Sequence, residues 1–129
     1  FVEFVPRVKL KNYYSASNCV LLPNQVKVEG NSGGDIGKYT SPLKMFEYLA
    51  AGCAVLASDF PLYRMLLHDA NCGIFVDPQN EAEIAQALID FTEQPEETLQ
   101  MGMKARSLFE AKYNWEMEAL KLREFYLSL

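Results

Sequence analysis

The stretch SPLKMFEYLAAGCAVLASDFP, residues 41–61, predicts a helix that leads directly into a buried strand. Ser41 is a typical N-cap residue, Pro42 fits the first helical position, and Gly52 suits the C-terminal end of the helix. The next residues, CAVLAS at 53–58, form an apolar run without polar alternation, which is typical of a strand covered on both faces. A helix and a doubly buried strand in succession indicate an α/β fold with a parallel sheet.

The same alternation continues on both sides of this stretch. Strands are expected at 1–5, 18–23, 53–58 and 72–77, and helices at 8–17, 42–51, from Pro61 onward, 81–91, 95–113 and 115–129. Residues 24–40 contain four of the seven glycines and are expected to form a long loop. Asn80 and Glu83 have the spacing of a capping box. The prediction is a three-layer α/β sandwich with a helical C-terminal tail, which packs across the sheet or onto something outside the chain.

Composition limits the classes of function. The chain has 129 residues, 50% of them hydrophobic, and a net charge of −5, which indicates one folded domain without a nucleic-acid-binding surface. No apolar run reaches the ~18–20 residues of a membrane span. The three cysteines form no CxxC pair and are expected to be buried, reduced thiols of a cytosolic protein. No cluster has metal-ligand spacing, and the start at Phe1 without a methionine suggests part of a longer protein.

Lys44 is the first candidate functional residue. It lies in the first turn of the predicted helix, where the exposed amide groups already carry partial positive charge and Asp or Glu is favoured. In open parallel α/β sheets, ligands bind at the carboxyl ends of strands beside helix N-termini. The charge of Lys44 and the helix N–H groups together predict an anion site, with phosphate as the natural ligand.

Glu47 is the second candidate. At about 100° per residue, the buried arc of the helix is predicted to contain Leu43, Phe46, Leu49 and Ala50. Glu47 then lies at the edge of that arc, where its carboxylate can accept hydrogen bonds from ligand hydroxyls, as acidic residues do with ribose. The alternative is an exposed Lys44–Glu47 pair at i, i+3, which contributes ~0.2–0.5 kcal/mol to the helix.

Four stretches resemble group 1 glycosyltransferases (family 4). They are SPLKMFEYLAAGCAVLASDFP, GIFVDPQNEAEIAQALIDF, YNWEMEALKLREFY and the N-terminal FVEFVPRVKLKNYYSASNCVLLPN. The resemblance implies a GT-B fold of two Rossmann-like domains, with residues 1–129 forming part of the C-terminal, donor-binding domain. The first strands of that domain and the N-terminal acceptor domain are then absent from this chain.

The resemblance also implies an activity. The full-length protein is expected to transfer a sugar, with retention, from a nucleoside diphosphate sugar to a hydroxyl of an acceptor glycan, lipid or small molecule. No metal or other cofactor is expected, and the fragment alone is expected to be inactive. The expected location is cytoplasmic, with membrane contact only through the missing parts.

Several site residues follow from the match between the motifs. Glu47 corresponds to the second glutamate of the family's Glu-x7-Glu pair, which binds the ribose. The segment Ser41, Pro42, Leu43 and Lys44 corresponds to the turn and helix start that approach the diphosphate, and Lys44 and Glu47 are the expected catalytic residues. Pro6 and Arg7 correspond to the loop that borders the nucleobase, although Pro6 replaces a common glycine.

The first glutamate of the pair is missing. Tyr39 stands at its position, so Tyr39 and Asp35 are the candidate contacts to the donor sugar. Two alternatives remain open from the sequence. One is a non-catalytic nucleotide-sugar-binding module, and the other is a flavodoxin-like α/β domain without sugar chemistry.

Overall fold

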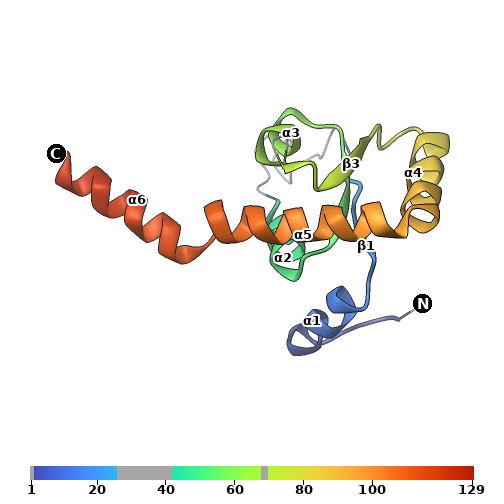
Figure 1. The fold of residues 1–129 in the computed structure, drawn as a ribbon, viewed down its shortest axis with the longest axis horizontal. Helices are drawn as coiled ribbons and strands as arrows, with labels where there is room; N and C mark the ends of the chain where they lie inside the picture. Colours follow the sequence, from blue (N-terminus) through green and yellow to red (C-terminus); the bar gives the residue numbers. More distant parts are fainter. Residues whose placement is uncertain (1, 26–41, 68–69) are drawn as a thin grey trace, which may run out of the picture.

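The computed structural model describes residues 2–25, 42–67 and 70–129. Within them, three parallel strands form a sheet in the order β1 (Cys19–Leu22), β2 (Ala54–Ser58) and β3 (Gly73–Val76) (Figure 1). Every residue of β2 is buried, as expected for the central strand. The predicted parallel sheet is confirmed, and each of these strands lies within its predicted range.

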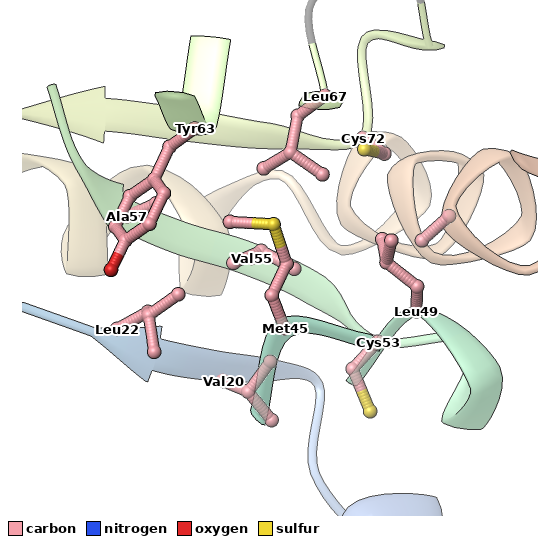
Figure 2. Close-up of a cluster of buried hydrophobic side chains, with 11 residues drawn as sticks. Val20, Leu22, Met45, Leu49, Cys53, Val55, Ala57, Tyr63, Leu67 and Cys72 are labelled. Carbon is pink, nitrogen blue, oxygen red and sulfur yellow. The ribbon is translucent and has the colours of Figure 1, made fainter. Parts of the chain in front are cut away.

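The helices cover the sheet on both faces. They are α1 (Arg7–Ser15), α2 (Leu43–Ala51), α3 (Pro61–Leu67), α4 (Glu81–Glu93), α5 (Pro95–Lys112) and α6 (Trp115–Leu127). Because side chains alternate along a strand, Val55 and Ala57 face the cluster that contains α2 and α3 (Figure 2). Ala54 and Leu56 face the opposite cluster, to which α4 contributes. The three-layer prediction is therefore confirmed.

The predicted strand at 1–5 is wrong for the residues that the structure describes. Residues 2–5 have no regular secondary structure and lead into α1, with Val2 61% and Phe4 84% exposed. A strand is stable only beside a partner that completes its hydrogen bonds, and the sheet order ends at β1 without including this segment. The apolar run is typical of a strand, but no strand that the structure describes pairs with it.

The start of α2 differs from the prediction. Pro42 occupies the N-cap position, with a non-helical ψ of 69°, and its carbonyl accepts a hydrogen bond from the Met45 amide at 2.8 Å. The residues that face the core are Met45 and Leu49, whereas Leu43 is 72% exposed. Leu43 lies about 200° around the helix from Met45 at 100° per residue, so its predicted place in the buried arc is wrong.

The other helix ends follow local sequence signals. Gly52 ends α2 in the left-handed conformation, with φ 72°. Asn80 caps α4 by accepting from the Glu83 amide at 3.2 Å, but the Glu83 carboxylate accepts from the Asp77 amide, so only half of the capping box forms. Asn114 caps α6 through the Met117 amide at 2.9 Å.

The C-terminal helix α6 extends away from the sheet (Figure 1) and has no buried residues. The predicted tail follows the last strand, and it packs across the sheet through α5, which contacts β2 and β3. Only α6, at the end of the tail, does not take part in this packing. The three cysteines are free thiols, and Cys53 and Cys72 are buried as predicted. The prediction is wrong for Cys19, which begins the outer strand β1 and is only partly buried.

Candidate functional site

Two helices that are distant in the sequence meet at Glu47. Arg7, the first residue of α1, donates from Nη2 to Glu47 Oε1 at 3.4 Å, across a separation of 40 residues. Tyr14, near the end of α1, donates its hydroxyl to the other carboxylate oxygen, Oε2, at 3.3 Å. Both oxygens of Glu47 therefore have a donor from α1. The alternative Lys44–Glu47 ion pair does not form, since the ion pair of Glu47 is with Arg7.

Tyr14 is fixed by contacts other than its hydroxyl. Its ring meets the Tyr48 ring edge-on, with centroids 5.3 Å apart. The Cys53 thiol donates to the Tyr14 carbonyl at 3.2 Å. Burial, followed by the nearby charge of Glu47, raises the pKa of Tyr14 above its usual value. The hydroxyl therefore keeps its proton near neutral pH and remains a donor to the carboxylate.

Glu47 lies beside an open groove of about 650 Å³ between α1, α2 and the α5–α6 junction. The lining residues are Arg7, Leu43, Phe46, Glu47, Ala50, Phe109, Tyr113, Asn114, Trp115, Glu116 and Glu118. Apolar and aromatic side chains form most of this surface, with charged groups from three helices at its edge. A site of this kind suits a ligand with a flat or apolar part and several hydroxyls.

The structure brings together only some of the predicted site residues. Arg7, Leu43 and Glu47 line the same groove, and Pro6 precedes it as the N-cap of α1. Pro42 is buried at the start of α2. Lys44 is exposed in the first turn of α2 but does not line the groove. The remaining three predicted residues lie outside the described residues: Asp35, Tyr39 and Ser41.

A network of polar side chains joins the carboxyl ends of β1 and β2. The fully buried Ser58 donates its hydroxyl to the Asn24 carbonyl at 2.7 Å. The Asn24 side-chain amide donates in turn to the Tyr63 hydroxyl on α3. These bonds hold the chain segment that follows β1 against the edge of the sheet where ligands of parallel α/β folds bind.

Asp59 and Arg64 form a second polar group at this edge. Arg64 donates to both carboxylate oxygens of Asp59, and its guanidinium lies 4.9 Å from the centre of the Phe75 ring. The hydrogen bonds from Arg64 lower the pKa of Asp59. A carboxylate that is held ionised and paired in this way is a poor general base, so its role is structural.

Across residues 2–25, 42–67 and 70–129, no three His, Cys, Asp or Glu side chains gather where they could hold a metal ion. None of the helices in the same ranges combines the length and the apolar character that a membrane span requires.

Sequence reasoning missed Tyr14. The available signal was its distance from Arg7, since residues seven apart on a helix lie on one face two turns apart. A cation and a hydroxyl on one face of α1 indicate a surface that can receive a carboxylate. The partner, Glu47, could not be deduced from this spacing because it is on a different helix.

The chain is similar to known proteins in both sequence and fold. The family model described as Glycosyl transferases group 1 matches residues 1–108. A solved structure, a sucrose-phosphate synthase from Thermosynechococcus elongatus, aligns with a TM-score of 0.76 and 26% sequence identity. The alignment covers 99% of this chain and 29% of the synthase chain. A search of curated protein sequences finds no match.

Proposed function

The chain belongs to the group 1 glycosyltransferases, and we propose that it binds the nucleoside diphosphate of a sugar donor within a retaining glycosyltransferase. Its fold is the Rossmann-like α/β fold of a GT-B glycosyltransferase domain. One observation carries the proposal: Arg7 and Glu47, which two separate motifs of the same resemblance assign to the nucleobase and the ribose, lie 3.4 Å apart at one groove. The full enzyme transfers the sugar to an acceptor hydroxyl.

Glu47 is the proposed ribose-binding residue. Its side chain is 41% exposed, so a ligand can reach the carboxylate, which only accepts hydrogen bonds and therefore suits sugar hydroxyls. The existing partner Arg7 is 89% exposed and 3.4 Å away. Exposed ion pairs of this kind contribute about 0–1 kcal/mol, so a ribose hydroxyl can displace Arg7 at little cost. Arg7 and Pro6 then border the nucleobase.

Lys44 and the start of α2 are the proposed diphosphate site. Lys44 is exposed and makes no ion pair with any residue that the structure describes. The free N–H groups of the first turn and the backbone amides of Ser41 and Leu43 add donors for phosphate oxygens, whereas Pro42 has no N–H and serves only to begin the helix. As the bond to the sugar breaks, these groups stabilise the departing diphosphate, so the chemistry that we propose uses protein donors and no metal cofactor.

The donor sugar and the acceptor complete the proposal. Asp35 and Tyr39 are the proposed sugar contacts, since Tyr39 occupies the position of the first glutamate of the family's pair. The acceptor is a glycan, lipid or small molecule bound outside this chain, which spans 29% of the synthase that it matches. The proposed location is the cytoplasm, with any membrane contact made by parts outside residues 1–129.

The substitution Glu47→Ala in the full-length protein tests the assignment. We expect donor affinity to fall about tenfold to a hundredfold, the usual effect of losing hydrogen bonds to a charged group. Calorimetric titration with nucleoside diphosphates measures the affinity, and sugar transfer measures turnover. Glu93→Ala is the matched control, because Glu93 is an exposed carboxylate at the end of α4 that does not line the groove. Unchanged affinity and turnover in Glu47→Ala would remove the ribose assignment.

Lys44→Ala separates the two parts of the donor. Loss of this charge should weaken the binding of the nucleoside diphosphate and of the complete nucleoside diphosphate sugar by the same factor. We expect about fivefold to twentyfold, as for a charge-assisted contact. Binding of the nucleoside alone should not change. Lys112→Ala, an exposed charge at the end of α5, is the control. Normal binding of both phosphate-containing ligands would exclude Lys44 from the site.

A further inference from the structure

We propose that Tyr14 is a positioning residue that holds the carboxylate of Glu47 for the ribose. The inference rests on the proposed function of Glu47 and adds a residue outside the motif that suggested it. Tyr14 reaches Glu47 Oε2 at 3.3 Å, while Arg7 reaches Oε1 at 3.4 Å. The two donors of α1 therefore approach different oxygens, and they differ in how firmly they are held.

Tyr14 is the firmly held donor. It is partly buried, its ring packs edge-on against Tyr48, and its carbonyl accepts from the Cys53 thiol. Arg7 has an 89% exposed side chain at the beginning of α1. A ligand that enters the groove can therefore displace the arginine from Oε1, whereas the tyrosine remains at Oε2.

The hydrogen bond from Tyr14 orients the Glu47 carboxylate. Glutamate has three side-chain torsions, and an exposed carboxylate samples many of their combinations. The hydrogen bond from Tyr14 fixes Oε2 toward α1, so Oε1 is the oxygen that remains for the hydroxyls of a ribose. Binding is tighter when an interacting group is held in its bound orientation beforehand, because less side-chain entropy is lost.

The chemistry of Tyr14 permits a clean test. Tyr14→Phe removes one oxygen atom and keeps the ring that contacts Tyr48 and the carbonyl that accepts from Cys53. Tyr13→Phe is the matched control, because Tyr13 is the adjacent residue on α1 and is 44% exposed. Both variants should retain the thermal midpoint of the wild type within about 2 °C, a shift typical of surface substitutions.

The experiment measures the affinity of the full-length protein for uridine, adenosine and guanosine diphosphates and for their 2′,3′-dideoxy counterparts. The wild type should bind the ribose form of its preferred nucleotide more tightly than the dideoxy form. In Tyr14→Phe, affinity for the ribose form should fall about threefold to tenfold, the effect of one hydrogen bond. Affinity for the dideoxy form should not change. In a Glu47→Ala background, Tyr14→Phe should have no further effect.

Each outcome decides the inference. If Glu47→Ala loses ribose discrimination and Tyr14→Phe keeps it, the positioning role is overturned while the proposed function stands. If Tyr14→Phe weakens ribose and dideoxy ligands equally, or lowers the thermal midpoint strongly, Tyr14 is structural and the inference is also overturned. If neither substitution changes the discrimination, the ribose assignment of Glu47 fails and the inference fails with it.

Discussion

Replacement of Gly102 by alanine tests how α5 holds the end of α2. A Cβ at Gly102 would lie 2.3 Å from the carbonyl oxygen of Gly52 and 3.3 Å from its carbonyl carbon. These are backbone atoms, so no rotamer change can relieve the contact. Gly52 has φ 72° and is itself constrained as the C-cap of α2. The two helices can accommodate the methyl group only by moving apart.

The expected magnitude combines two opposing effects. Glycine to alanine inside a helix contributes about 1 kcal/mol of intrinsic stability. Moving the oxygen from 2.3 Å to an ordinary contact near 3.5 Å requires a shift of about 1 Å, and overpacking of this kind costs about 1–3 kcal/mol or more. Leu49 and Ala105, both fully buried, lie on these two helices. Because the contact is with backbone atoms, the cost lies at the upper end of that range, so we expect a net destabilisation of about 2 kcal/mol, which lowers the thermal midpoint by about 4–8 °C.

Differential scanning calorimetry of the full-length protein measures this change. Ser107→Ala on the same helix is the control, since Ser107 is exposed and its hydroxyl donates to the Met103 carbonyl one turn earlier. That variant should be neutral or slightly more stable because alanine is the better helix former. A thermal midpoint that rises in Gly102→Ala would refute the close approach of α5 to α2.

The remaining predictions concern one thiol and two helix caps. Burial raises the pKa of the Cys72 thiol from 9.0 to about 11. Between pH 9 and 11 the thiol is therefore deprotonated in the unfolded chain before it is in the folded chain. The free energy of unfolding falls over this range by up to about 2–3 kcal/mol. Urea unfolding at pH 8 and pH 10.5 measures how much less stable Cys72→Ala is than the wild type. This difference in the free energy of unfolding should be smaller at pH 10.5, and an equal difference at both pH values contradicts the prediction. Asn80→Ala should lower the thermal midpoint through loss of about 1 kcal/mol, because α4 is packed in the core. Asn114→Ala removes the same kind of cap from α6, which buries no residue. It should therefore reduce the helical circular dichroism signal and leave the thermal midpoint unchanged. A lower midpoint in Asn114→Ala together with an unchanged midpoint in Asn80→Ala would contradict the packing of both helices.

Local signals predicted most of the fold. The strand runs are apolar throughout, which is the pattern of doubly buried strands, and Gly52, Asn80 and Asn114 end or begin helices as their residue types favour. What failed depends on tertiary contacts. The run at 2–5 has strand composition, but none of the strands that the structure describes pairs with it. On α2, the prediction holds for Leu49, which is fully buried, and for Phe46, which packs against the core, whereas Leu43 is exposed and Met45 is buried instead. That rotation of the helix is fixed by what it packs against.

The sequence pointed to single residues of the candidate site but not to how they meet, because their meeting also depends on tertiary contacts. The motif around residues 41–61 directed attention to Lys44 and Glu47, and a second motif to Pro6 and Arg7. Spacing alone does not place residues 40 positions apart side by side, and only the structure shows that contact. The spacing of Tyr14 from Arg7 is a sequence signal for a shared helix face, but it does not identify Glu47 on α2 as the partner.

The electrostatics of α2 favour a ligand over a purely structural role. Lys44 opposes the helix dipole, which costs the helix about 0.3–1 kcal/mol in the first turn, and the described ion pairs do not offset it. Glu47 meanwhile forms a long, exposed ion pair with Arg7 that contributes little. A structural helix of this charge would be more stable with the two residues exchanged, since the acid would then face the N-terminus. In the function that we propose, the diphosphate meets Lys44 and the ribose reaches Glu47 one turn later, so the ligand must extend beyond the groove, because Lys44 does not line it.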